Sequence, residues 1–338
     1  MATDDHAAAR ATKAPGILAA LSRGVDIRFA AIWLALLVLL AVSAVVAPRS
    51  LLFSSLLSIV PFAAFLSVAA MGEAIVLMSR GIDLSIPAIV TLASTVLLGV
   101  SGGKNGGLAG AIVAALASAC AIGLINGLLV AVVRLNALIV TLAVGAITAG
   151  ATLWYREGMA QESSVPQLLA DWGGTRIVNL NVAVWVAAIL VLILTVVLRK
   201  TTFGRRFAAV GANPQAARIA GINVPAYQIA AFTVAGFLYG VAGILVSGFV
   251  RNPTLNVGDP YLLAPIAAAV LGGTAITGGI GSMIAVAGAA LFLTHLGQML
   301  KVLGISTAFQ FLINGLAIAL GMAMAESRFL RLSWWRGR

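Results

Sequence analysis

Charged side chains are scarce in this chain of 338 residues: Lys, Arg, Asp and Glu make up 9% of it, whereas hydrophobic residues make up 61%. A soluble domain is usually about one quarter charged, so these charges are too few to cover a surface that faces water. The apolar runs are long and continuous, and a helix needs roughly 20 apolar residues to cross a bilayer. The composition excludes a soluble enzyme and predicts an all-α, polytopic membrane protein.

Cysteine and histidine are also nearly absent. The single cysteine, Cys120, lies inside an apolar run and cannot form a disulfide framework or a metal site. Of the two histidines, His295 is expected to be a polar group that packs between helices. We therefore expect no metal and no catalytic residue on this chain.

Basic residues exceed acidic ones by 11, but this excess does not predict nucleic-acid binding. The charges lie in the connections between apolar runs, where membrane topology explains them. If the N-terminus is cytoplasmic, 15 of the 21 Lys and Arg residues fall in cytoplasmic segments. This asymmetry predicts an even number of spans with both termini in the cytoplasm, and it places residues 156–181 outside and 199–227 inside.

Ten transmembrane helices are predicted. Their ranges are 29–47, 56–78, 86–101, 107–133, 137–155, 182–198, 228–250, 261–275, 281–300 and 305–325. The first run has no cleavage site of a signal peptide near it and is interpreted as a retained helix. The predicted organisation is a cytoplasmic N-terminal segment (1–28), a transmembrane domain (29–325) and a basic, aromatic cytoplasmic tail (326–338).

Two apolar stretches resemble each other, LINGLLVAV at 124–132 and LINGLAIAL at 312–320. At a similar offset, the sequence GIDLS (81–85) faces GGT (272–274). These matches predict a parallel internal repeat of five plus five helices, and transporters built from repeats often place their sites at broken helices. Chance similarity between apolar segments is the alternative.

Three segments interrupt the apolar background. The first is MSRGIDLSIPA (78–88), in which a broken connection is predicted. Gly81 would open the turn, Ser85 could cap the next helix and Pro87 suits its first turn. Asp83 is costly at membrane depth unless it is partnered. An ordinary hairpin outside the membrane is the alternative.

The second segment, residues 203–227, predicts a short helix outside the membrane over residues 214–220. Asn213 is a favourable N-cap, Pro214 fits the first helical position, and Gly221 fits the left-handed position that ends a helix. A helix of this length does not persist alone, so a partner surface is expected. The third segment, AAAVLGGTAITGGIGS (267–282), contains five glycines and predicts a discontinuous or sharply turned helix pair.

Together these segments resemble the permease subunit of ribose-type ABC importers, a family of permeases for monosaccharides and polyols. The resemblance covers residues 30–325 and is carried by GIDLS (81–85), by FGR (203–205) with GANPQAAR (211–218) and AGINV (220–224), and by VLGGT (270–274) with GG (278–279) and GS (281–282). Arg80 stands where this family often has Gly.

The resemblance implies a homodimer in the bacterial inner membrane, a cytoplasmic ATPase and an extracytoplasmic solute-binding protein. No phosphate-binding G-x-x-x-x-G-K-[ST] motif occurs in the chain. ATP and Mg²⁺ would therefore bind the partner ATPase, and this chain carries no cofactor. A branched-chain amino-acid permease of the same superfamily, an ion-coupled secondary transporter and a membrane scaffold are the alternatives.

Three groups of candidate site residues follow. The expected ATPase-coupling residues are Asn213, Pro214, Gln215, Ala216, Ala217, Arg218 and Gly221. The expected broken-helix residues are Gly81, Asp83, Ser85, Gly272, Gly273 and Thr274. The candidate pathway residues are Glu73, Asn126, Thr141, Gln310 and Asn314. Ala216 and Ala217 are small and would allow a partner to approach closely, whereas polar groups in the spans could equally bond helix to helix.

Overall fold

The computed structural model describes residues 27–159 and 164–306, together with 308–310, 312–313, 315–316 and 319. The predicted tail at 326–338, nearly all of the N-terminal segment and Asn314 lie outside these residues. The last predicted span, 305–325, is described only in part.

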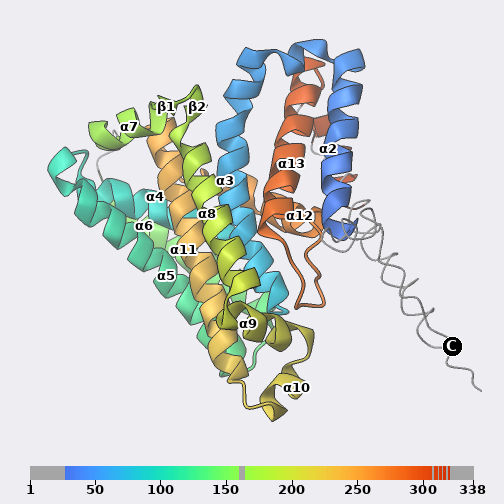
Figure 1. The fold of residues 1–338 in the computed structure, drawn as a ribbon. Coiled ribbons are helices and arrows are strands. Elements are labelled where there is room, and N and C mark those ends of the chain that lie inside the picture. The colour runs from blue at the N-terminus through green and yellow to red at the C-terminus, as the bar shows by residue number, and fades with distance from the viewer. Residues whose placement is uncertain are drawn as a thin grey trace, which may run out of the picture.

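The described chain is almost entirely helical (Figure 1). The longer helices are α2 (Ile27–Val46), α3 (Phe53–Met78), α4 (Ile86–Ser101), α5 (Leu108–Ala131), α6 (Ala137–Glu157), α8 (Val182–Lys200), α9 (Thr202–Ala212), α11 (Val224–Val250) and α13 (Met283–Val302). The shorter elements are η1 (Pro48–Leu51), η2 (Asn105–Gly107), α7 (Gln167–Gly174), α10 (Pro214–Ile219), η3 (Asp259–Tyr261), α12 (Ala264–Leu271) and the antiparallel strands β1 (Arg176–Ile177) and β2 (Leu180–Asn181).

Seven of the described helices are long and apolar enough to cross a membrane. The apolar helix α4 and the run from η3 to α12 are shorter, because each lies next to one of the interrupted segments. Each of the first nine predicted spans overlaps one of these helices. The structure confirms an all-α, polytopic membrane protein, while the count of ten spans and the five-plus-five repeat stay predictions.

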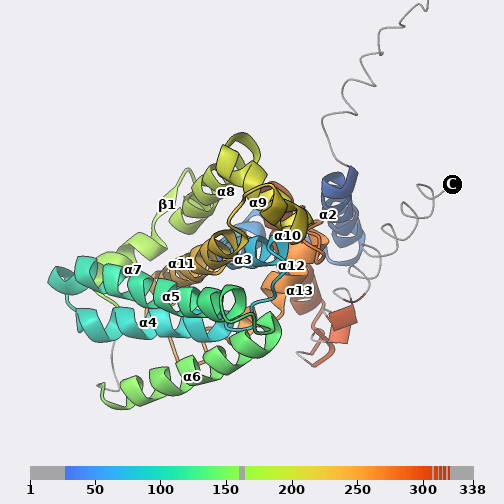
Figure 2. The same cartoon turned by 90° about the horizontal axis from the view of Figure 1, so that it is seen from below.

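Helix α3 forms the centre of the molecule, between α11, α8, α12 and α13 (Figures 1 and 2). All of its residues from Ala63 to Met78 are buried. Glycines let the helices approach closely: a Cβ on Gly72 would lie 2.6 Å from Cε1 of Tyr239 in α11. Helix α5 crosses α11 in the same way, where a Cβ on Gly236 would lie 3.1 Å from the Gly123 Cα.

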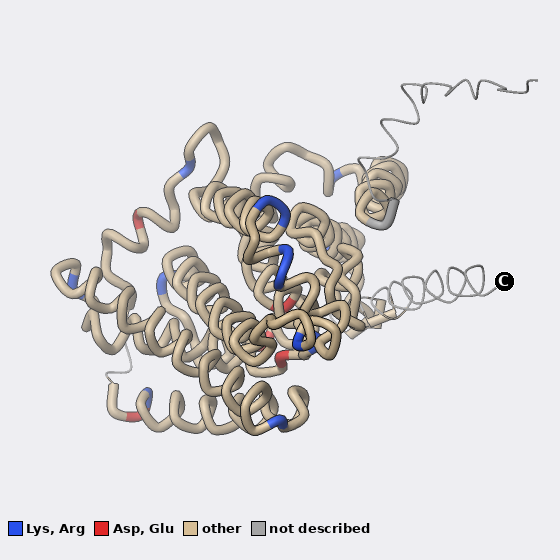
Figure 3. Tube along the Cα trace, turned by 60° about the horizontal axis from the view of Figure 1, so that its bottom comes forward, with Lys and Arg blue, Asp and Glu red and all other residues tan. Residues whose placement is uncertain are grey.

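Two features of the connections were not predicted. Residues 202–212 form the helix α9, which precedes α10 in the second interrupted segment. The connection 156–181 contains α7 and the β1–β2 hairpin. Charged residues are few along the described chain, and most lie in connections or near helix ends (Figure 3).

Candidate functional site

The connection between α3 and α4 is a broken helix, as the first segment predicted. Helix α3 ends with Arg80 at φ +70°, and the Gly81 amide donates to the Val76 carbonyl over 3.0 Å, which is a left-handed helix end. A Cβ on Gly81 would lie 2.8 Å from Cζ of Phe232, so a side chain there would collide with α11. The chain then runs without helix through residues 81–85 until α4 begins.

Asp83 is fully buried in this non-helical segment. Its Oδ1 accepts hydrogen bonds from the Ser85 amide at 2.9 Å and from the Ser85 hydroxyl at 2.5 Å. Ser85 lies at the N-cap of α4, but its side chain does not cap that helix as expected, and its hydroxyl instead donates to Asp83. The side-chain amide of Asn126, from α5, donates to the Ser85 oxygen over 2.9 Å.

Helices α3, α6 and α11 each add one polar group to the same place. The Asp83 amide donates to Oε1 of Glu73 over 3.4 Å, and the Tyr239 hydroxyl donates to Oε2 of Glu73 over 3.2 Å. The Leu84 amide donates to Oγ1 of Thr141 over 3.0 Å. We call these side chains the buried polar network. Its members are Glu73, Asp83, Ser85, Asn126, Thr141 and Tyr239.

The network holds two carboxyl groups without a cationic partner. Glu73 and Asp83 both have 0% exposure, and no Lys or Arg is among their hydrogen-bond partners in the described residues. A charge is costly at membrane depth, so the donors of Ser85 and Tyr239 hold these carboxyls in place. Two buried acceptors, Oδ2 of Asp83 and Oδ1 of Asn126, have no hydrogen-bond partner in the described chain and could accept from a further donor.

The three interrupted segments meet at one end of the bundle. The Gly279 amide, from the third segment, donates to the Met78 carbonyl over 2.8 Å at the end of α3. Gly211, near the end of α9, lies against both Met78 and Gly279: a Cβ added to Gly211 would be 2.8 Å from the Gly279 Cα. Gly278 and Gly279 have φ of +91° and +79°, a conformation that glycine adopts without steric cost. We call the meeting point of residues 78–80, 211–212 and 278–279 the motif junction.

Helix α10 is held at both ends as predicted, and it is one residue shorter than expected. The Asn213 side chain accepts from the amides of Gln215 at 3.1 Å and Ala216 at 3.0 Å. Pro214 occupies the first position and Gly221 has φ +78°.

The expectation for Ala217 was wrong in one respect. Ala217 is buried and packs in a cluster with Val210 and Val224, so it holds α10 against its own chain instead of facing a partner. The free face of α10 consists of exposed residues, and Ile219 is 90% exposed. The members of this face are Gln215, Ala216, Arg218 and Ile219.

The third segment is discontinuous, as predicted. Helix α12 ends at Gly272, whose added Cβ would lie 2.8 Å from the Val286 Cα in α13, and Gly273 follows at φ +83°. The Thr274 amide donates to the Ala269 carbonyl over 3.0 Å and its side chain is buried. None of these three residues contacts the buried polar network through a described hydrogen bond. The side-chain amide of Gln310 donates to the Ile305 carbonyl, and Gln310 likewise makes no described hydrogen bond to the buried polar network.

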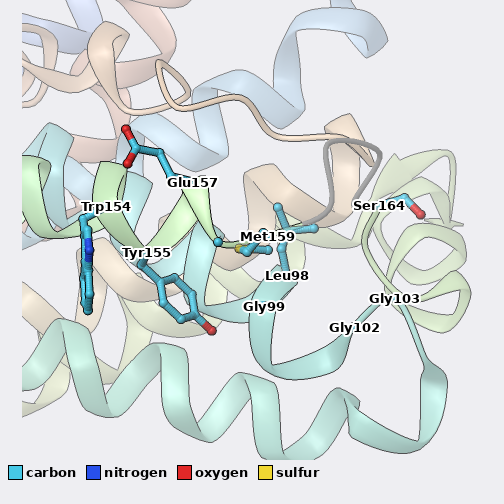
Figure 4. A pocket seen from close by; sticks show the side chains of 10 residues that line it. Leu98, Gly99, Gly102, Gly103, Trp154, Tyr155, Glu157, Met159 and Ser164 are labelled. Atoms are coloured by element: carbon cyan, nitrogen blue, oxygen red, sulfur yellow. The ribbon is translucent and has the colours of Figure 1, made fainter.

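A cavity of about 990 Å³ lies at the end of α4 remote from Ser85 (Figure 4). Its lining comes from the ends of α4 and α6 and includes Gly99, Tyr155, Met159 and Ser164. A Cβ on Gly99 would collide with the Tyr155 ring, so this glycine makes room for the aromatic side chain. None of the candidate site residues lines the cavity.

Comparison with known proteins places the chain in a family. Residues 55–322 match the model of the family described as "Branched-chain amino acid transport system / permease component". The chain is 32% identical to the ribose import permease protein of Escherichia coli (strain K12) over 298 residues, which cover 87% of this chain and 92% of that protein.

Two further relatives agree with this assignment. The chain is 31% identical to the ribose import permease protein of Bacillus subtilis (strain 168), over 88% of this chain and 92% of the relative. It is 29% identical to the L-arabinose ABC transporter permease protein of Azospirillum brasilense, over 71% and 67% of the two chains. No solved structure matches the chain significantly. The chain belongs to this family of transport-system permease components.

Proposed function

We propose that this chain is the membrane permease subunit of an ATP-driven importer for a small polyhydroxylated solute, a monosaccharide in particular. The observation that carries the proposal is the meeting of the three interrupted segments at the motif junction, where Arg80 is three residues from Asp83 of the buried polar network. A broken helix with polar side chains from several helices is the usual setting of a transport site. The membrane-spanning chain is a translocation subunit.

A monosaccharide is favoured over an amino acid by the chemistry of the network. All six of its members supply hydroxyl, amide or carboxyl groups that can accept or donate hydrogen bonds to a neutral solute. No Lys or Arg that could pair with a carboxylate of the solute is among their hydrogen-bond partners in the described residues. The relatives named for ribose and L-arabinose support the same class. The family description names branched-chain amino acids, which makes this class the matched comparison for an experiment.

We infer that α10 contacts a separate ATPase on the cytoplasmic side. A six-residue helix is too short to be stable alone, and it is fixed here by caps and by Ala217. Its free face presents Ile219, which is 90% exposed and therefore available to a partner surface. A homodimer and an extracytoplasmic binding protein complete the proposed assembly.

The proposed topology has both termini in the cytoplasm, ten spans and the domain limits 1–28, 29–325 and 326–338. The basic residues support this orientation. The proposed repeat is supported by a shared feature of α3 and α12: each ends in a left-handed residue, Arg80 or Gly273, followed by an amide that bonds five residues back.

The substrate class is tested by competition. The permease, its ATPase and its binding protein are reconstituted in liposomes, and uptake of ¹⁴C-labelled D-ribose is measured with ATP. Excess unlabelled D-ribose or L-arabinose is expected to reduce the labelled uptake, and excess L-leucine is expected to leave it unchanged. Uptake of labelled L-leucine without uptake of any of the sugars would contradict the proposal.

A further inference from the structure

Arg80 joins two parts of the protein that are far apart in the sequence. Its Nε donates to the Gly211 carbonyl over 2.6 Å, and its Nη2 donates to the Ala212 carbonyl over 2.5 Å. Both acceptors lie at the C-terminal end of α9, where carbonyl groups lack partners within the helix and carry partial negative charge. A guanidinium group supplies two donors in a fixed geometry, which suits this pair of carbonyls.

The backbone conformation of Arg80 does not by itself favour an arginine. Arg80 has φ +70°, a conformation in which the Cβ of an L-residue is crowded and which glycine adopts freely. A glycine would therefore fit the turn at the end of α3 better than an arginine. The two hydrogen bonds to α9 are what the arginine adds.

Arg80 lies on a short path between α10 and the buried polar network. On one side, Ala212 is followed directly by Asn213, whose side chain caps α10. On the other side, Arg80 is three residues from Asp83, whose amide bonds Glu73 and whose carboxylate bonds Ser85. The path is closely packed, since a Cβ on Gly278 would lie 2.5 Å from Cγ of Arg80.

We propose that Arg80 is a positioning residue that ties the end of α9 to residues 81–85, so that a displacement of α10 moves the backbone of the buried polar network. The inference rests on the proposed function, because it takes the ATPase as the source of that displacement. Movement passes through contiguous packed groups, and the Arg80 guanidinium is the contact between the two backbones.

The test uses the assembled permease and ATPase in detergent. Hydrogen–deuterium exchange is measured in peptides that cover residues 79–86, with and without ATP and vanadate. The variants are Arg80→Gly, which fits the same backbone conformation without the guanidinium, and Arg80→Lys, which keeps the charge with a single donor nitrogen. Arg134→Gly is the matched control, because Arg134 also has positive φ, at +64°, and its side chain makes no hydrogen bond within the described chain.

Nucleotide is expected to change exchange at residues 79–86 in the wild type and in Arg134→Gly. In Arg80→Gly this change should shrink by at least about threefold, because two charge-assisted hydrogen bonds are lost, and Arg80→Lys should lie between. A nucleotide-driven change of equal size in Arg80→Gly, or no change in the wild type, would overturn the proposal. Failure of the wild type to import any sugar, with the nucleotide response present, would instead count against the proposed substrate.

Discussion

The side-chain amide of Asn126 donates a hydrogen bond to the Ser85 hydroxyl over 2.9 Å, and this bond joins α5 to the first residue before α4. The same hydroxyl donates to Asp83. Three residues from two distant parts of the sequence therefore form one chain of hydrogen bonds, and both ends of this chain have a free buried acceptor.

Replacement of Asn126 tests whether this chain of hydrogen bonds serves transport. Asn126→Leu keeps a similar volume but removes the donor to Ser85, which leaves a buried hydroxyl with one partner fewer at a cost of about 1–3 kcal/mol. We expect solute uptake to fall at least about tenfold, which equals 1.4 kcal/mol, while the amount of protein in the membrane is unchanged. Ser118→Ala is the control on the same helix, because the Ser118 hydroxyl bonds only its own helix. An equal fall of uptake in both variants would show that the hydrogen bond of Asn126 has no specific role in transport.

Glu73 is expected to act as a hydrogen-bond acceptor. Glu73→Gln keeps one carbonyl-type oxygen for the Asp83 amide or the Tyr239 hydroxyl and should lower the melting temperature little. Glu73→Leu leaves both donors without a partner, and each buried unsatisfied group costs about 1–3 kcal/mol. Thermal unfolding in detergent should therefore separate the two variants clearly. Equal melting temperatures would show that the two bonds, at 3.4 and 3.2 Å, contribute little.

Gly211 is expected to tolerate no side chain. An added Cβ would lie 2.5 Å from the Gly279 nitrogen and would also collide with the Met78 carbonyl oxygen, and backbone atoms cannot rotate away as side chains can. Gly211→Ala should destabilise the protein by about 1–3 kcal/mol, as overpacking does. Gly110→Ala is the control, since nothing lies within 4 Å of its added Cβ. A melting temperature of Gly211→Ala at or above that of Gly110→Ala would contradict the close backbone packing at the motif junction.

Variants of α10 separate its backbone from its exposed face. At Gly221, with φ +78° and nothing within 4 Å of an added Cβ, Val carries a backbone cost of about 1–2 kcal/mol that Asn largely avoids. Gly221→Val and Ile219→Asp should both weaken co-purification of the ATPase, whereas Gly221→Asn should not. Leu168→Asp is the control, because it places the same charge at an exposed residue of α7, in the connection 156–181 and away from α10. Undiminished co-purification with Ile219→Asp would place the ATPase contact elsewhere.

Much of the fold could be predicted because each helix that crosses a membrane must be a long apolar run in the sequence. Two of the breaks were also predictable, since Gly221 and Gly273 are residues that the left-handed conformation favours, whereas at the first break this conformation falls on Arg80 and not on Gly81. Helix α9 was missed because its residues 202–212 carry two arginines and two glycines between the apolar positions, and its stability comes from packing against α8 and the motif junction.

The assembly of the site could be predicted only in part. Glu73, Asn126 and Thr141 were noticed as polar groups in apolar spans, but a sequence does not show which faces of three helices meet at residues 81–85. Tyr239 was missed, and its signal was a hydroxyl group in the middle of an apolar run, which needs a partner when buried. Ala217 was assigned to the wrong face because a small residue fits a packed contact with its own chain as well as one with a partner.

The central claim is that this chain moves a monosaccharide with energy received from a separate ATPase. Its most direct test is uptake of labelled D-ribose by liposomes that contain the permease, the ATPase and the binding protein, compared with liposomes that lack only the ATPase. The account predicts uptake that requires ATP, ceases without the ATPase and is unaffected when a proton ionophore collapses the pH gradient. Uptake of the sugar by the permease alone, driven by an ion gradient and indifferent to ATP, would contradict it.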